Sequence, residues 1–130
     1  MKINVYSRAK DWYKQLSHNF KVNEFACLDG SEVILICPEL VEVLQDVRNH
    51  FKAPVTINSG YRSEPYNKKV GGATKSQHIY GKAADIVVKD VKPAAVASYL
   101  ENKYPGKYGI GRYDKFTHID TRELMSRWKG

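Results

Sequence analysis

Two histidines of this sequence have neighbours that could take part in metal chemistry. His78 and Asp85 lie seven positions apart, and the glycine and small alanines between them let the chain turn and bring both side chains to one point. In the run Phe-Thr-His-Ile-Asp at residues 116–120, strand alternation places His118 and Asp120 on one face. Two neutral imidazoles and one carboxylate form a three-ligand set suited to zinc, with a fourth position left for water. Residue types alone leave both a metal site and a chance arrangement open.

The segments around these residues are predicted as interleaved helices and strands. After Pro38, apolar residues recur at the spacing of a helix buried on one face, and Pro54 ends it. Further helices are expected at residues 8–17, 65–70 and 93–104, and strands at residues 55–59, 85–88, 108–111 and 117–121. The link between the last two strands is too short for a parallel crossover, so the sheet should be antiparallel or mixed. The expected fold class is therefore α+β.

Length and composition indicate one ordinary domain. The chain has 130 residues, 42% of them hydrophobic and 27% charged, so we expect residues 1–130 to fold around a single core. The longest apolar stretch, at residues 33–37, is far shorter than the roughly 20 residues that cross a bilayer. No apolar run follows Met1 and Lys2, which predicts a chain made in the cytoplasm without a signal peptide. Cys27 and Cys37 are expected to be buried free thiols or to form one bridge that closes a short loop.

The charge balance favours a polyanionic partner. The formal net charge is +7, and such a surface attracts polyanions by a long-range force that salt weakens. Nucleic acid, an anionic cell wall and an anionic membrane face all fit this description. Net charge therefore indicates the sign of the partner and not its identity.

Six segments, in the order of the chain, resemble one protein family. They are residues 23–27, 57–63, 66–73, 76–85, 109–120 and 127–128, and they include the runs Ser-Gly-Tyr-Arg-Ser and Ser-x-His-x-x-Gly-x-Ala-x-Asp. These motifs are similar to those of the zinc D-Ala-D-Ala carboxypeptidases, the VanY-like peptidoglycan metallopeptidases of the hedgehog/DD-peptidase superfamily. The resemblance is to the short single-domain branch found in phages and bacteria. It implies an antiparallel or mixed sheet with flanking helices and a zinc site on the sheet.

The resemblance also implies roles for individual residues. His78, Asp85 and His118 would be the zinc ligands. Arg62 would bind substrate, because a guanidinium can hold a carboxylate bidentately or stabilise a developing oxyanion. Hydrogen bonds beside the metal and a wall of the peptide groove would come from Ser76, Gln77, Tyr61 and Trp128. For the two aromatic residues, packing in the core is the alternative.

The general base is the point at which this sequence departs from the family. Many members have an acidic residue three positions before the last zinc histidine, where this chain has Lys115, whose charged form cannot accept a proton. Asp114, one residue further back, and Asp120, on the strand face of His118, are the two candidates. Asp120 could instead orient a ligating histidine, as carboxylates often do at zinc sites.

The resemblance predicts a zinc metallopeptidase that hydrolyses amide bonds in the stem or cross-link peptides of peptidoglycan. It would be a D,D-carboxypeptidase or an endopeptidase, endolysin-like and monomeric, and would reach the cell wall after holin-type release or lysis. One alternative is a catalytically silent zinc module that binds cell-wall peptides, which Lys115 favours. A second is a nucleic-acid binder that stacks bases on its nine tyrosines, but no recognition motif is visible and we expect no nucleic-acid partner.

Overall fold

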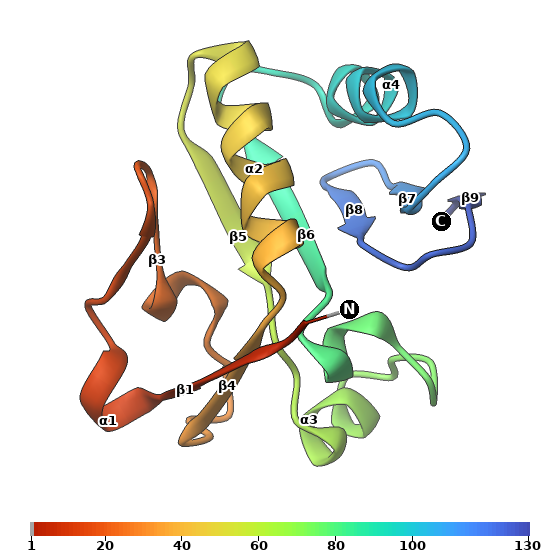
Figure 1. The fold of residues 1–130 in the computed structure, drawn as a ribbon. Helices are drawn as coiled ribbons and strands as arrows, with labels where there is room; N and C mark the ends of the chain where they lie inside the picture. The colour runs from red at the N-terminus through yellow and green to blue at the C-terminus, as the bar shows by residue number, and fades with distance from the viewer. Residues whose placement is uncertain (1) are drawn as a thin grey trace.

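A five-stranded mixed sheet forms the centre of the fold in the computed structural model, which describes residues 2–130 (Figure 1). Its strands are β5 (Val55–Ser59), β6 (Ala83–Val88), β7 (Gly109–Arg112), β8 (Thr117–Asp120) and β9 (Ser126–Lys129). They lie in the order β5-β6-β8-β7-β9, with β7 and β9 parallel and the other neighbours antiparallel. The sheet and its helices confirm the predicted α+β class.

Two helices pack on one face of this sheet and supply much of the core. The helix α2 (Pro38–Phe51) packs against β5 and β6, and α4 (Pro93–Lys103) packs against β6, β7 and β8. Both helices begin at a proline, whose fixed φ suits the first helical turn. The core joins helix and sheet side chains that are almost completely buried, among them Leu40, Leu44, Val47, Val96, Leu100, Ile86, Ile110 and Ile119.

Strand alternation leaves the other face of the sheet for polar residues. Ile86 and Ile119 belong to the core, so their chain neighbours Asp85 and His118 point to the opposite face. The pairing register then sets one residue from each strand side by side, in a line that we call the central row. From β5 to β9 the central row is Ser59, Asp85, His118, Gly111 and Trp128.

The N-terminal part of the chain adds two small sheets beside this framework (Figure 1). One pairs β1 (Asn4–Ser7) with β4 (Val33–Ile36), and the other pairs β2 (Gln15–Ser17) with β3 (Phe20–Lys21). The remaining elements are short helices, namely α1 (Arg8–Asp11), η1 (Val22–Phe25), α3 (Glu64–Lys69) and η2 (Gln77–Tyr80). Of these, α3 and η2 lie between β5 and β6 in the chain, and η2 packs against β6.

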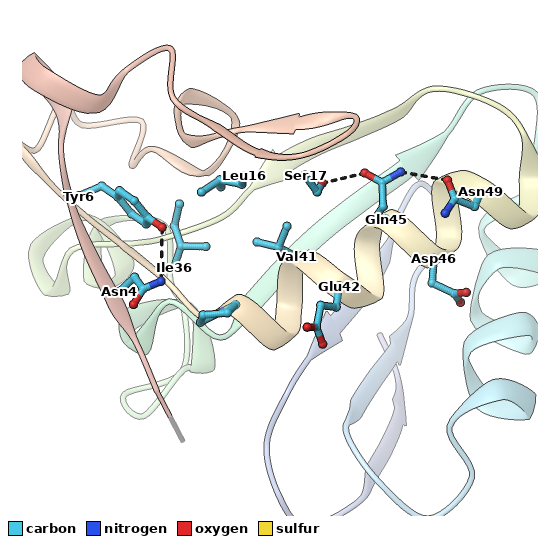
Figure 2. Close-up of a pocket in the computed structure, with 11 residues that line it drawn as sticks. Asn4, Tyr6, Leu16, Ser17, Ile36, Val41, Glu42, Gln45, Asp46 and Asn49 are labelled. Atoms are coloured by element: carbon cyan, nitrogen blue, oxygen red, sulfur yellow. Dashed lines mark hydrogen bonds between the residues drawn. The ribbon is translucent and has the colours of Figure 1, made fainter.

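Gln45 of α2 attaches the β2–β3 hairpin to the helix. Its side-chain oxygen accepts hydrogen bonds from Ser17 Oγ at 2.7 Å and from the Asn19 backbone at 2.9 Å. Its nitrogen donates to Asn19 Oδ1 at 2.8 Å and to Asn49 Oδ1 at 3.0 Å. These bonds cross one wall of a cavity of about 470 Å³ between β1, β2 and α2 (Figure 2). Because the amide uses all of its donors and acceptors within the protein, Gln45 has a structural role here.

Most predicted helices and strands are present, but the helix expected at residues 8–17 is wrong beyond Asp11. The backbone of residues 12–17 turns away to pair with the chain that follows it. Asn23 N donates to Trp12 O at 3.1 Å, and Val22 N donates to Lys14 O at 3.0 Å, next to the β2–β3 pair. Pairing with a nearby strand therefore overrides a helical pattern that only local spacing suggested. The strands β1, β2, β3, β4 and β9 are additions that the sequence did not predict.

Two further sequence expectations concern the cysteines and the membrane. Cys27 and Cys37 are both buried thiols, which is the first of the two expected alternatives. Along the described chain we find no helix that combines the length and apolar character needed to span a bilayer.

Candidate metal centre and active-site cavity

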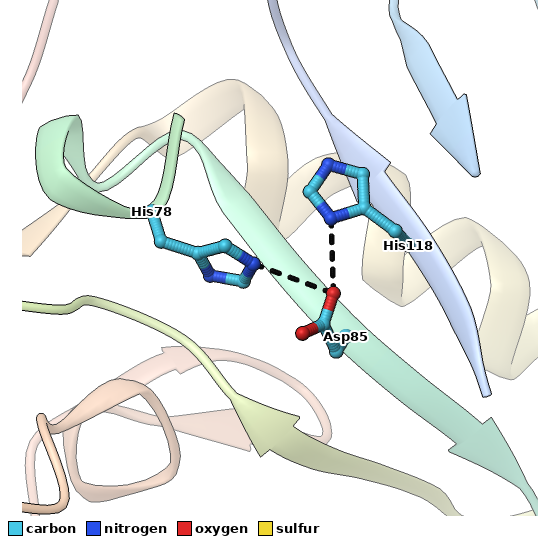
Figure 3. A group of neighbouring side chains, drawn as sticks. All are labelled: His78, Asp85 and His118. Carbon is cyan, nitrogen blue, oxygen red and sulfur yellow. Dashed lines mark hydrogen bonds and ion pairs between the residues drawn. The ribbon is translucent and has the colours of Figure 1, made fainter. Parts of the chain in front are cut away.

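Three buried side chains from three different elements meet on the polar face of the sheet. His78 comes from η2, Asp85 from β6 and His118 from β8, and their ligand atoms all lie within 4.8 Å of one another. Both rings point toward the same carboxylate oxygen (Figure 3). His78 Nε2 lies 3.3 Å and His118 Nδ1 lies 2.9 Å from Asp85 Oδ1. The exposed fractions are 3%, 8% and 8%, so these groups are held together away from bulk water.

The sheet register and one tight turn place these residues. Asp85 and His118 are direct partners in the β6–β8 ladder, so their side chains lie next to each other on one face. His78 sits in η2, where Ser76 Oγ accepts a hydrogen bond from its backbone N–H at 3.2 Å. Gly81 ends η2 with φ of 72°, and a Cβ there would lie 2.4 Å from Leu35 O. Only glycine fits this turn, which returns the chain into β6.

Hydrogen bonds fix which nitrogen of each histidine faces the carboxylate. His78 Nδ1 lies 2.7 Å from Gly60 O, and because a carbonyl can only accept, Nδ1 carries the hydrogen. His118 Nε2 lies 2.7 Å from Asp120 Oδ2, so Nε2 carries the hydrogen in the second ring. His78 Nε2 and His118 Nδ1 are therefore the nitrogens that face Asp85. Such outer partners orient ligating histidines at metal sites.

Asp120 is held from behind by an arginine. Arg122 Nε donates to Oδ1 at 2.8 Å and its Nη2 donates to Oδ2 at 2.7 Å, and the Arg122 backbone N–H also reaches Oδ1 at 3.1 Å. Gly109, the partner of Asp120 in β7, leaves the space for this pair, because a Cβ there would lie 2.4 Å from Oδ2. Asp120 is completely buried, and both of its oxygens are occupied.

Arg62 engages the outer oxygen of Asp85. Its Nη2 lies 3.3 Å from Asp85 Oδ2, while Nε donates to Ser59 Oγ at 3.0 Å and Nη1 donates to Asn67 Oδ1 at 3.2 Å. Asn67 is itself fixed, since its Nδ2 donates to Ala73 O at 2.8 Å. Asp85 is thus oriented by Arg62 on one side and presents Oδ1 to the two histidines on the other.

The charge states follow from these contacts. Burial raises the pKa of Asp85, but hydrogen bonds from His118 and His78 outweigh it and hold the pKa well below the ordinary value. Burial likewise raises the pKa of Asp120, and its bonds to Arg122 and His118 bring the net pKa below the ordinary range. For His118, burial lowers the pKa, while Asp120 and Asp85 raise it above the ordinary value. Two ionised carboxylates beside two imidazoles suit a divalent cation.

A cavity of about 490 Å³ opens beside the three residues. Three aromatic side chains, Tyr113, Phe116 and Trp128, line it together with the polar Ser76 and Gln77. Trp128 reaches the site along the central row, and its ring centroid lies 5.0 Å from that of His118. The cavity therefore offers both apolar contact and hydrogen-bonding groups to a ligand at the His/Asp/His cluster.

The structure brings together most, but not all, of the residues predicted to form the site. The cavity is lined by Arg62, Ser76, Gln77, His78, Asp85, His118 and Trp128 from that set. Tyr61 is absent from the lining, and Asp114 is exposed in the turn after β7. Tyr113, Phe116 and Arg122 line the cavity although the sequence interpretation assigned them no role. Tyr113 lies within the family-like segment 109–120, but no local pattern shows that its side chain turns into the cavity.

Gly111 lets Trp128 lie over the central row, which gives a testable prediction. A Cβ at Gly111 would lie 2.6 Å from the Trp128 ring, so Gly111→Ala should push the indole out of the cavity wall and toward solvent. The chain has two tryptophans, and a Trp12→Phe background leaves Trp128 as the only tryptophan, which is excited selectively at a wavelength that tyrosine does not absorb. We expect a red shift of fluorescence in Gly111→Ala relative to that background. An unchanged spectrum would show that the strand accommodates the methyl group without moving Trp128.

A buried His/Asp/His donor set beside an open cavity, on an α+β sheet, is the kind of centre found in mononuclear zinc hydrolases. The family model described as Peptidase M15 matches residues 16–120, and the chain belongs to this family. Family membership confirms the resemblance that the motifs indicated.

A curated relative gives a more local match. The chain is 54% identical over 33 residues to the zinc D-Ala-D-Ala carboxypeptidase of Streptomyces albus G. This match covers 25% of the chain and 13% of the length of the relative. The similarity is therefore strong but confined to a short segment.

Proposed function

We propose that this chain is a zinc-dependent peptidase that hydrolyses amide bonds in the stem or cross-link peptides of peptidoglycan. The observation that carries the proposal is the convergence of two imidazole nitrogens, His78 Nε2 and His118 Nδ1, on one oxygen of Asp85 at the wall of a cavity. Membership of the Peptidase M15 family supports the reaction, and the name of the Streptomyces albus G relative supports the substrate class.

The donor set of the cluster fits zinc. His78 would bind through Nε2, His118 through Nδ1 and Asp85 through Oδ1, and three protein ligands beside a cavity leave one position open. When bound, zinc supplies a Lewis acid that activates water near neutral pH and polarises the amide carbonyl. The chain itself supplies the orientation: Gly60 O holds His78, Asp120 holds His118 and Arg62 holds Asp85.

We assign different roles to the two carboxylates that the sequence offered as general base. Asp120 is buried, and both of its oxygens already accept hydrogen bonds, so we propose that it positions His118. Asp114 is exposed and has no hydrogen bond or ion pair among the described residues. It directly follows Tyr113, which lines the cavity, and we propose it as the proton acceptor for the attacking water.

The role of Asp114 predicts a kinetic defect without a defect in metal binding. Asp114→Asn should lower kcat by about 10²- to 10⁴-fold, the usual contribution of a general base. Zinc content, measured by mass spectrometry of the metal, should match the wild type because Asp114 contacts none of the ligands. Asp90→Asn is a matched control, since Asp90 is exposed and lies after β6, outside the cavity lining. Wild-type turnover by Asp114→Asn would exclude it as the base.

One observation favours a second candidate function, a zinc module that binds cell-wall peptides without cleaving them. Among the described residues, Asp85 is the only carboxylate that lines the cavity, and Lys115 stands where many relatives have an acid. A site without a proton acceptor could still bind a peptide oxygen through its metal.

Digestion of purified peptidoglycan distinguishes the two candidates. The zinc-loaded chain and a chelator-treated sample are incubated with intact sacculi and with soluble muropeptides, and the products are read by mass spectrometry. Zinc-dependent loss of a terminal D-alanine would identify a carboxypeptidase, and new internal termini would identify an endopeptidase. Stoichiometric zinc with no product from either substrate would favour the silent module.

A further inference from the structure

The aromatic wall of the cavity contains a hydroxyl group whose role is not explained by the metal centre. Tyr113 and Trp128 both line the cavity, and Trp128 Nε1 lies 2.9 Å from Tyr113 Oη. An indole N–H can only donate, so the phenol oxygen is the acceptor in this bond. The hydrogen of the phenol must then point elsewhere, and no described residue accepts it.

The Tyr113 ring is held firmly in place. It stacks on Phe116 with ring centroids 4.4 Å apart and an interplanar angle of 12°. The backbone of Gly130 also lies against the Tyr113 ring, since a Cβ at Gly130 would be 2.0 Å from Tyr113 Cε1. Gly130 is held there because its N–H donates to Arg112 O at 2.8 Å. A ring fixed by packing and by a hydrogen bond is preorganised, so it loses little freedom when a ligand binds.

Trp128 is fixed as well, which makes it a reliable anchor for the phenol. Its ring lies over Gly111, beside His118 and below the Arg122 guanidinium, whose central carbon is 5.2 Å from the ring centroid. The indole therefore connects the phenol to the row of residues that carries the metal ligands. Tyr113 Oη is thus linked through Trp128 to His118.

The two arginines of the cavity are engaged elsewhere, whereas Lys75, which also lines it, makes no hydrogen bond or ion pair among the described residues. The three side-chain nitrogens of Arg62 donate hydrogen bonds to Asp85, Ser59 and Asn67, and Arg122 donates to Asp120. The Ser76 oxygen accepts the hydrogen bond that caps η2, so the Ser76 hydroxyl can still donate its own hydrogen. A peptide oxygen that enters the cavity can find donors in Lys75, Ser76, Gln77 and Tyr113. Of these, the Tyr113 hydroxyl is held by both a ring stack and a hydrogen bond.

We infer that Tyr113 is a catalytic residue that donates a hydrogen bond, through Oη, to an oxygen of the peptide bound at the metal centre. The inference rests on the proposed peptidase function and adds a substrate contact that the metal ligands do not supply. Trp128 is a positioning residue in this arrangement, because its N–H occupies the phenol oxygen and so directs the phenol hydrogen into the cavity.

Removing the hydroxyl group while keeping the ring tests this inference. Tyr113→Phe preserves the stack on Phe116, and we expect kcat/KM for muropeptide hydrolysis to fall by about 100-fold, as it does when one transition-state donor is lost. Trp128→Phe should cause a smaller loss. Tyr13→Phe is the control, since Tyr13 is 77% exposed and lies outside the cavity. Zinc content and the unfolding midpoint should not change in Tyr113→Phe.

The outcomes separate this inference from the proposed function. If the wild type hydrolyses muropeptides and Tyr113→Phe does so within twofold of it, the donor role is wrong and the peptidase stands. If the wild type is inactive, the peptidase proposal fails, and calorimetric titration of the zinc-loaded proteins with acetyl-D-Ala-D-Ala decides the donor role. Affinity that is about tenfold weaker in Tyr113→Phe would support the donor. Equal affinity, or no binding by the wild type, would overturn it.

Discussion

His118→Ala is expected to abolish zinc-dependent hydrolysis and to weaken zinc binding by more than about 100-fold, because even the loss of an outer hydrogen-bond partner costs 10- to 100-fold. The variant removes one of three convergent ligand atoms and leaves Asp120 Oδ2 without its imidazole partner. Two remaining protein ligands do not make the three-ligand set that catalytic zinc sites use. Competition with a chromophoric chelator measures the affinity, and muropeptide digestion measures the activity.

A stability measurement separates loss of the site from loss of the fold. A metal that binds only the folded state stabilises it by about 2.7 kcal/mol when its concentration is 100 times Kd. The wild type should therefore unfold at higher denaturant concentration when zinc is added, whereas His118→Ala should not respond. His18→Ala is the matched control, since His18 is exposed and distant in sequence from the cluster. A zinc response in His118→Ala equal to that of the wild type would show that the metal binds elsewhere.

The parts of the fold that the sequence predicted are those with a strong local signal. The apolar spacing after Pro38 predicts α2, and the β-branched run at residues 55–59 predicts β5, because each pattern requires one buried face. The same spacing rule failed at residues 8–17, where only Arg8–Asp11 is helical. There the hydrogen bonds come from the adjoining β2–β3 segment, and a helical pattern carries no information about that partner.

The grouping of His78, Asp85 and His118 could be predicted because these residues lie in recognisable motifs, whereas the contacts that Arg62 and Trp128 make with them could not. Arg62 reaches Asp85 across 23 positions of the chain, and Trp128 reaches His118 because a parallel strand adds to β7. Both contacts join segments that are separated in the sequence, and no short segment encodes how such segments pack together. The same is true of Tyr113, whose hydroxyl group becomes a candidate donor only when Trp128 is placed beside it.

The roles that we propose for Asp114 and Asp120 also rest on the structure. In the sequence both are acids near His118, and strand alternation placed Asp120 on the same face as His118, as a general base would require. The structure shows that this face is shared with Gly109 and Arg122, which fill the space around the carboxylate. A carboxylate with no free oxygen orients its neighbour more readily than it accepts a proton from water.

Asp120→Asn should weaken zinc binding by about 10- to 100-fold, the effect expected when an outer carboxylate partner of a ligating histidine is replaced. It should also destabilise the fold by about 1–3 kcal/mol, because the new amide nitrogen faces either the His118 N–H or the Arg122 guanidinium, both of which are donors. Chelator competition and urea unfolding measure the two effects. The control is again Asp90→Asn, which makes the same chemical change at an exposed position.

Turnover at saturating zinc decides whether Asp120 positions His118 or accepts the proton. A positioning residue acts through the metal site, so Asp120→Asn should recover activity to within about tenfold of the wild type once zinc is in excess, whereas a lost general base would keep kcat lower by about 10²-fold or more. Gly109→Ala gives an independent test, because its Cβ would lie 2.4 Å from Asp120 Oδ2 and displaces the pair without changing its chemistry. If the pair controls the metal site, Gly109→Ala also weakens zinc binding. If both variants bind zinc like the wild type, Asp120 does not orient the ligand.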